Sequence, residues 1–141
     1  MVRFVSESTE QTEAFAEKIG KAVTSGTVIA FFGGLGAGKT SFTRGLARGM
    51  GISADVSSPT FAIVNDYGGN PPLVHFDMYK VESWDDLYSS GFFDYLDMGA
   101  VLAVEWSENI ENALPDSTVR VTIEKCDDEN KRIITVEGLD I

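Results

Sequence analysis

Continuous apolar runs and alternating apolar and polar residues mark different kinds of strand in this chain. The runs TVIAFFG at 27–33 and AVLAVE at 100–105 are typical of strands that are buried on both faces in a parallel sheet. The alternating stretches TVRVTIEK at 118–125 and KRIITVEG at 131–138 flank CDDEN and predict an antiparallel pair. We therefore expect a sheet that contains both parallel and antiparallel neighbours.

A second hairpin is predicted in the middle of the chain. TFAIVNDY at 60–67 and LVHFDMY at 73–79 flank GGNPP, whose glycines and prolines are typical of a turn. A further short strand is predicted at 3–6.

Helical patterns separate these strands. In the segment 6–23, Ser8 with Gln11 three residues later resembles a capping box, and the apolar residues recur on one helical face. Those apolar residues are Phe15, Ile19, Ala22 and Val23. Further helices are predicted over 39–50, over 83–99 with a break at Gly91, and over 107–114. In 91–99 the aromatic residues are interpreted as core, with an interface as the alternative.

Together these elements predict an α/β fold, with a mixed sheet, flanking helices and antiparallel hairpins. The 141 residues, 1–141, are expected to form a single domain.

Charge restricts the partners that this domain can have. The chain has 22 acidic and 11 basic residues, for a net charge of −11, and Lys80 is the only Lys or Arg from Gly49 to Val119. Nucleic acids are bound largely through Lys and Arg, so any role on tRNA or DNA is expected to be indirect or to run through a partner protein. Solubility alone is the alternative reason for the acidic excess.

Two features predict a reduced, cytoplasmic protein. Cys126 is the only cysteine and cannot form an internal disulfide. No apolar run approaches the roughly 20 residues of a membrane-spanning helix, and the N-terminus does not read as a secretory signal.

The stretch GGLGAGKT at 33–40 fits the Walker A pattern of nucleotide-binding loops in full, with Gly33, Gly38, Lys39 and Thr40 at the specified positions. Glycines let backbone N–H groups surround a phosphate, and the helix that follows adds its positive end. The Lys39 ammonium can reach the β- and γ-phosphates, and the Thr40 hydroxyl can ligate Mg²⁺. The sequence therefore predicts a P-loop nucleotide site.

Two acids are candidates for the rest of this site. Glu105 ends the apolar run VLAVE and is the candidate for the second acid beside Mg²⁺. Asp77 in HFDMYK is a candidate for holding a metal-bound water or for acting as the base, with a solvated acid at a strand end as the alternative.

These residues alone do not decide which class of nucleotide-binding protein the chain belongs to. The chain contains no Asn-Lys-x-Asp stretch, which disfavours GTP. The stretch where a kinase lid would lie holds only Lys80, and a missing arginine leaves charge on the transferring phosphoryl group poorly stabilised. We expect slow hydrolysis in isolation and a need for a partner. A small-molecule kinase with an atypical lid and a nucleotide-gated binding protein are the alternatives.

Four motifs together resemble the TsaE family: GGLGAGKTSFTRGLARGMGI, VSSPTF, HFDMYK and LAVEW, in this order. The resemblance covers nearly the whole chain. It implies a small bacterial P-loop ATPase that is required for threonylcarbamoyl modification of the tRNA adenosine beside the anticodon. It further implies the cofactors ATP and Mg²⁺, and a heterodimer of two actin-like-fold proteins, TsaB and TsaD, as the partner.

The resemblance also implies residue roles. Lys39, Asp77 and Glu105 would be catalytic, Thr40 and Glu105 would ligate the metal, and 58–61 (SPTF) would be a switch-like segment near the γ-phosphate. The base would lie near the first helix and the C-terminal strands, close to Thr9, Thr12, Lys131 and Arg132, although solvated hairpin charges are the alternative for the last two. The predicted nucleotide-binding set is Gly33, Gly34, Leu35, Gly36, Ala37, Gly38, Lys39, Thr40, Ser41, Thr60, Trp106, Thr9 and Arg132.

Three positions depart from the family pattern. Gly34 replaces an acid, Ser41 replaces a threonine, and Lys80 replaces an arginine and cannot form a bidentate contact. His75, the only histidine, is interpreted as a structural residue.

Overall fold

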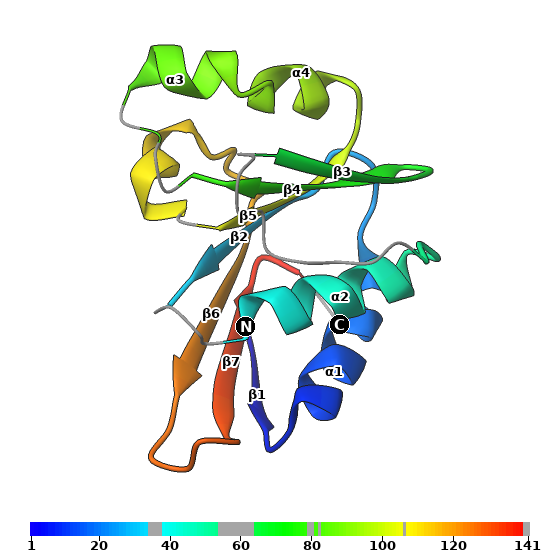
Figure 1. Ribbon diagram of the computed structural model, residues 1–141, viewed down its shortest axis with the longest axis vertical. Helices are drawn as coiled ribbons and strands as arrows, with labels where there is room; N and C mark the ends of the chain where they lie inside the picture. The colour runs from blue at the N-terminus through cyan, green and yellow to red at the C-terminus, as the bar shows by residue number, and fades with distance from the viewer. Residues whose placement is uncertain (34–37, 54–63, 79–80, 82, 106, 140–141) are drawn as a thin grey trace.

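The structure is a computed structural model that describes residues 1–33, 38–53, 64–78, 81, 83–105 and 107–139. Its described strands form one sheet in the order β1-β7-β6-β2-β5-β4-β3 (Figure 1). The strands are β1 (Val2–Ser6), β2 (Val28–Phe32), β3 (Val64–Gly69), β4 (Pro72–Asp77), β5 (Val101–Glu105), β6 (Val119–Lys125) and β7 (Arg132–Glu137).

The sheet is mixed, as the sequence predicts. Strands β4, β5, β2 and β6 are parallel to their neighbours in the centre, whereas β3 pairs antiparallel with β4 and β7 pairs antiparallel with β6. The sheet is twisted, so that β3 and β4 run in a different direction from β6 and β7 in Figure 1. The continuous apolar runs of β2 and β5 lie at the centre, where both faces are covered.

The helices also follow the sequence prediction. They are α1 (Thr9–Ala22), α2 (Lys39–Gly49), α3 (Trp84–Ser89) and α4 (Phe92–Asp97), and Gly91 with φ +87° separates the last two. The segment predicted as a short helix over 107–114 is a 3₁₀ helix, η1 (Ser107–Ala113), which is kinked at Ile110.

The predicted hairpin 60–79 is present with a narrower turn. Gly68 and Gly69 still belong to β3 and Pro72 already begins β4, so only Asn70 and Pro71 connect the strands. Residues 60–63 of the predicted first strand lie outside the described residues.

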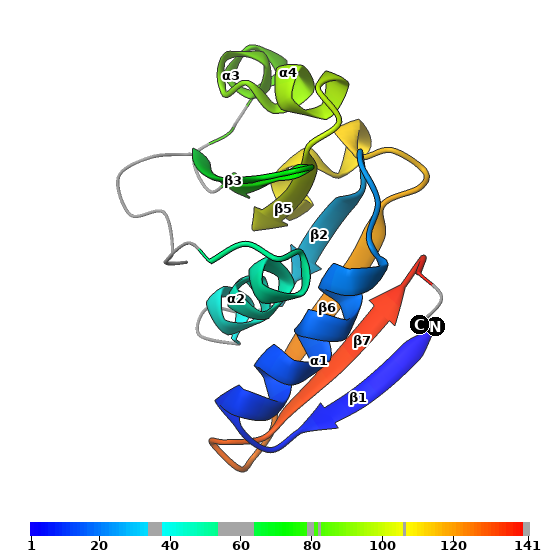
Figure 2. The same ribbon diagram turned by 90° about the vertical axis from the view of Figure 1, so that its right-hand side faces the viewer.

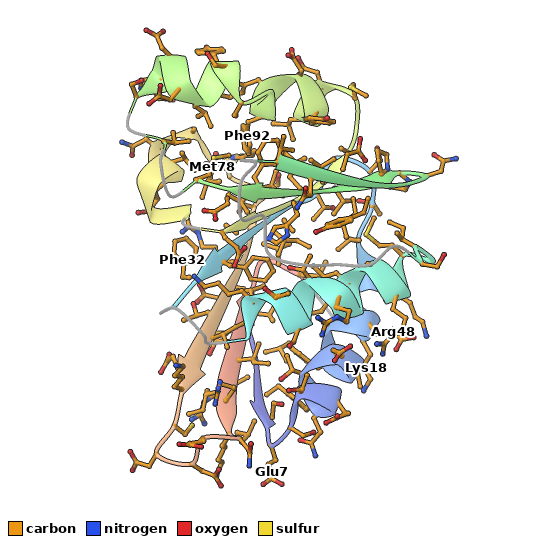
Figure 3. The ribbon with its side chains drawn as sticks, in the orientation of Figure 1. Glu7, Lys18, Phe32, Arg48, Met78 and Phe92 are labelled. Carbon is orange, nitrogen blue, oxygen red and sulfur yellow. The ribbon has the colours of Figure 1, made fainter. Side chains whose placement is uncertain are left out.

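Two helix layers cover opposite faces of the sheet. Helices α1 and α2 lie on one face, and α3 and α4 lie on the other (Figure 2). Phe15 and Phe42 pack from the first pair into one core cluster, whereas Phe92 packs from α4 with Phe76 and Met78 into the other (Figure 3).

The predicted Ser8 cap starts α1, but the Gln11 side chain bonds the N–H of Glu7 and not that of Ser8, as it would in a capping box. Ser8 Oγ accepts a hydrogen bond from the Gln11 backbone N–H at 3.1 Å, and Gln11 Oε1 accepts one from the Glu7 N–H at 2.8 Å. Ser6 and Thr12 hold the same helix start to β1 through a buried hydroxyl contact of 2.7 Å. The beginning of α1 is therefore fixed relative to the sheet.

Helices α1 and α2 touch through glycines. A Cβ on Gly45 would lie 2.3 Å from the Glu13 carbonyl oxygen, and a Cβ on Gly49 would lie 2.1 Å from the Glu17 carbonyl oxygen. The backbones approach this closely because these positions carry no side chain. Both contacts join residues 32 positions apart, so the two helices run in the same direction with their first turns side by side.

Replacing Gly45 with alanine is expected to lower the free energy of unfolding by about 1–3 kcal/mol. The added methyl group would lie 2.3 Å from the Glu13 carbonyl oxygen and 2.7 Å from Ala16 Cβ, so the helices must separate. Urea unfolding followed by circular dichroism measures the change. The control is Lys18→Ala, an exposed position on α1, which is expected to change stability by no more than about 0.5 kcal/mol. A Gly45→Ala protein as stable as the parent would show that the helices can separate without cost.

Candidate functional site

The predicted acids meet at one edge of the sheet. Asp77 is the last residue of β4, Glu105 is the last residue of β5, and the two are paired in register on neighbouring parallel strands. Strand β2 lies on the other side of β5 and ends at the same edge, just before the glycine-rich loop. Sequence reasoning predicted that both acids end strands, and the sheet order brings them together.

Glycines are required on both sides of the loop. Gly33 has φ +132°, and a Cβ there would lie 2.3 Å from the Ile123 carbonyl oxygen of β6. Gly38 has φ +105° and is the N-cap residue of α2, where it supplies no side-chain cap. The start of α2 has the backbone geometry with which helices bind anions.

The first turn of α2 carries the residues predicted to contact phosphate and metal. Lys39 is the first helical residue and is only 8% exposed, and its carbonyl oxygen accepts a hydrogen bond from Thr43 Oγ1 at 2.9 Å. Phe42 on the same turn packs edge to face on Phe31 of β2, with ring centroids 5.4 Å apart. This contact fixes the helix start over the end of the strand that leads into the loop.

His75 contacts Glu105, which sequence reasoning missed. The His75 ring is fully buried, and its Nε2 lies 2.8 Å from Glu105 Oε2. Because a carboxylate accepts, Nε2 carries the proton and donates it. His75 lies two residues before Asp77 on β4, so both side chains are on the face of the sheet that carries Glu105.

The other ring nitrogen of His75, Nδ1, is also buried. Nδ1 has no hydrogen-bond partner among the described residues. Such a group costs about 1–3 kcal/mol. A hydrophobic residue at position 75 would avoid that cost, but it would also lose the hydrogen bond to Glu105. The period-2 pattern of β4 was the available signal, since it places His75 and Asp77 on one face.

A small polar pocket of about 170 Å³ lies beside the start of α2. It brings together the first turns of α1 and α2 and the hairpin between β6 and β7, and Lys131 is not among its described lining residues. The lining residues are Ser8, Thr9, Thr12, Gly38, Ser41, Glu129, Asn130 and Arg132. Thr9, Thr12 and Arg132, which the resemblance located only roughly, thus meet Gly38 and Ser41 in one pocket.

Arg132 is held in place at this pocket. Its Nη1 donates to the carbonyl oxygens of Glu129 at 2.6 Å and Lys131 at 2.9 Å. The guanidinium is therefore tied to the hairpin that forms one wall.

Several predicted site residues fall outside the described residues: Gly34, Leu35, Gly36, Ala37, the segment 58–61 with Thr60, Lys80 and Trp106.

The oxygen donors at the strand ends match the preference of Mg²⁺. This ion takes oxygen ligands and commonly uses one or two carboxylates together with substrate phosphates and waters. Glu105, Asp77 and the Thr40 hydroxyl supply oxygen donors on elements that meet at this edge. The residues present therefore fit a magnesium ion that is bound together with phosphate.

None of the helices among the described residues combines the length and the apolar character that crossing a bilayer requires.

Comparison with known proteins gives a consistent result. The family model described as threonylcarbamoyl adenosine biosynthesis protein TsaE matches residues 6–134. A relative from Treponema pallidum, named tRNA threonylcarbamoyladenosine biosynthesis protein TsaE, is 34% identical over 132 residues and spans 94% of this chain and 98% of its own. A protein of the same name from Bacillus subtilis is 38% identical over 125 residues, 88% of this chain and 78% of its own.

A solved structure agrees with these relatives. The crystal structure of Bacillus subtilis YdiB is similar with a TM-score of 0.79 and 32% identity, and the match covers 96% of this chain and 83% of that one. The chain therefore belongs to the TsaE family of threonylcarbamoyl adenosine biosynthesis proteins.

Proposed function

We propose that this chain is the ATP-binding and ATP-hydrolysing subunit that supports threonylcarbamoyl modification of tRNA adenosine next to the anticodon, through a partner heterodimer of the TsaB–TsaD type. One observation carries the proposal: Asp77 and Glu105 are paired in register at the ends of neighbouring strands. The Walker A loop starts from the same edge of the sheet and leads into α2. If the loop holds a phosphate chain, both carboxylates would lie near the Mg²⁺ ion that accompanies the phosphates.

The chain's own residues divide the work between binding and hydrolysis. The N–H groups at the start of α2 and the Lys39 ammonium bind the phosphate oxygens. Thr40 and Glu105 would hold Mg²⁺, which neutralises phosphate charge when it is bound. Asp77 orients the attacking water or accepts its proton, and His75 holds the Glu105 carboxylate at 2.8 Å. The resulting enzyme is a magnesium-dependent ATPase.

The polar pocket takes the nucleoside. It begins at Gly38 and Ser41, next to the phosphate loop, and ends at Thr9, Thr12 and Arg132. Because the first turns of α1 and α2 both open on it, its walls combine hydroxyl groups with the positive ends of two helices.

Replacing Arg132 with alanine is expected to raise the KM for ATP several-fold with little change in kcat. The guanidinium lines the nucleoside pocket, whose lining does not include Asp77. Its loss is therefore expected to weaken binding of the substrate and of the transition state by the same amount. Steady-state phosphate release over a range of ATP concentrations measures both constants. Arg3→Ala, at an exposed position on β1, is the control and should change neither. A fall in kcat with unchanged KM would contradict the assignment.

The test of the function is phosphate release with and without the purified TsaB–TsaD heterodimer. The protein alone is expected to hydrolyse ATP slowly, because the paired strands β4 and β5, which carry Asp77 and Glu105, contain no arginine. Addition of the heterodimer is expected to raise the rate, and the three proteins together with tRNA are expected to yield threonylcarbamoyladenosine. ADP formation that instead tracks a phosphorylated metabolite would support a small-molecule kinase and overturn the proposal.

A further inference from the structure

Three aromatic side chains on α3 and α4 contact one another and are here called the aromatic patch: the exposed Trp84 and Tyr88 and the partly buried Phe93. Trp84 is 55% exposed and Tyr88 is 63% exposed. Trp84 stacks on Phe93 with centroids 6.4 Å apart and planes at 13°, and Tyr88 lies 4.7 Å from the same ring. The three rings are therefore one continuous apolar surface.

The two exposed rings, Trp84 and Tyr88, lie outside the core cluster, whereas Phe93 is partly buried and packs against it. Leu87 on α3 and Phe92 on α4 are core residues, and both are at most 2% exposed. Phe92 contacts Phe76 of β4 with centroids 5.7 Å apart, and Figure 3 shows it between α4 and the sheet. A single exposed aromatic needs no explanation, but stacked exposed rings are typical of the centres of protein interfaces.

The surroundings of the aromatic patch are uniformly acidic. Asp85, Asp86, Asp94 and Asp97 are exposed on the same two helices. The chain has no Lys, Arg or His from Val81 to Val119. Nucleic acid and anionic lipid would be repelled. A second copy of the same face would place like charges against each other, so self-association is disfavoured as well.

The position of the aromatic patch separates it from the nucleotide site. Helices α3 and α4 cover the face of the sheet opposite to α1 and α2, whose first turns line the nucleoside pocket (Figures 1 and 2). A protein bound to the aromatic patch therefore leaves that pocket open to solvent.

We propose that the aromatic patch is the docking surface for a protein partner that presents an apolar pocket ringed by Lys and Arg. The inference rests on the proposed function, in which this partner is the TsaB–TsaD-type heterodimer. Aromatic residues at the centre supply the affinity, and the four aspartates select a basic rim and raise the association rate at low salt.

The test compares the dissociation constant of the heterodimer for the parent protein and for Trp84→Ala/Tyr88→Ala, measured by biolayer interferometry. The double variant is expected to bind at least about tenfold more weakly, with unchanged ATP hydrolysis in the absence of the partner. Val5→Ala, an exposed apolar position on β1, is the matched control and should bind like the parent.

A charge variant tests the same surface without removing an aromatic ring. Asp97→Lys is expected to weaken binding, with an effect that shrinks as salt increases, whereas Glu137→Lys, an exposed acid on β7, should not. The Asp97→Lys result also decides the matter if the aromatic variant does not fold.

The outcomes separate the two proposals. Parent-like binding by both the aromatic and the charge variant would overturn the docking surface alone. If the parent protein itself does not bind the heterodimer, the proposed function fails, and the assigned occupant of the aromatic patch fails with it.

Discussion

Replacing Lys39 with alanine is expected to lower the rate of ATP hydrolysis about 10²–10³-fold and to weaken ATP binding. Lys39 begins α2 and is 8% exposed, so its ammonium acts where water screens poorly. Its positive charge therefore lies at the start of the helix that follows the glycine-rich loop. Without it the phosphate oxygens lose a charge-assisted donor in the ground state and more of their stabilisation in the transition state.

The effect has to be separated from a general loss of positive charge. Lys21→Ala removes a lysine that is 68% exposed at the other end of α1, and it should leave both ATP affinity and turnover unchanged. Nucleotide affinity is measured by titration calorimetry and turnover by phosphate release. Undiminished hydrolysis by Lys39→Ala would remove the glycine-rich loop from the proposed site.

Replacing Glu105 with glutamine is expected to lower kcat about 10²-fold or more while ATP affinity stays within a few-fold. The amide keeps the size of the side chain and can still accept from His75 Nε2, so the strand ends should stay in place. What is lost is the negative charge at the metal side of the site. Single-turnover hydrolysis and the Mg²⁺ dependence of nucleotide binding measure the two effects.

His75 offers a matched pair of variants around the same carboxylate. His75→Leu fills a similar volume without a donor, whereas His75→Gln retains an N–H that can reach Glu105. Because groups that orient a ligand typically contribute 10–100-fold, the leucine variant is expected to lose about tenfold in kcat and the glutamine variant to recover part of it. The leucine variant should also need more Mg²⁺ for half-maximal nucleotide binding.

Stability distinguishes positioning from folding in these variants. His75→Leu removes a buried nitrogen that has no partner among the described residues, so its unfolding temperature should be no lower than that of the parent. A leucine variant with parent activity would mean that Glu105 needs no help to hold its position. A glutamine variant as slow as the leucine variant would mean that the imidazole acts in another way.

Local patterns predicted the elements because each depends on neighbours in sequence. The alternation at 118–125 and 131–138 specified β6 and β7, and the apolar runs ending at Phe32 and Glu105 specified the central strands. Ser8 and Gln11 marked the start of α1 because a cap is a local hydrogen bond. The segment 107–114 was less well predicted, since a kinked 3₁₀ helix has no distinctive period.

Contacts between distant positions could not be predicted in the same way. The hydrogen bond between His75 and Glu105 joins residues 30 positions apart, and it exists only because β4 and β5 are neighbours in the sheet. From the sequence alone, Gly45 is only a residue with low helix propensity. The structure shows that the Glu13 backbone of α1 packs against it, which leaves no room for a side chain. In GFFDYLDMG the expectation of core holds for Phe92, which is buried, and in part for Phe93, which packs against the core and also against two exposed rings of α3.

The glycine contacts between α1 and α2 have an electrostatic consequence. They hold two parallel helices together, so two helix ends of the same sign lie next to each other and repel. Ser8 caps α1, whereas α2 begins at Gly38 without a side-chain cap. An anion bound between these ends removes the repulsion. If the chain binds a nucleotide as proposed, the phosphates would reduce this repulsion, and binding would stabilise the fold as well as supply the chemistry.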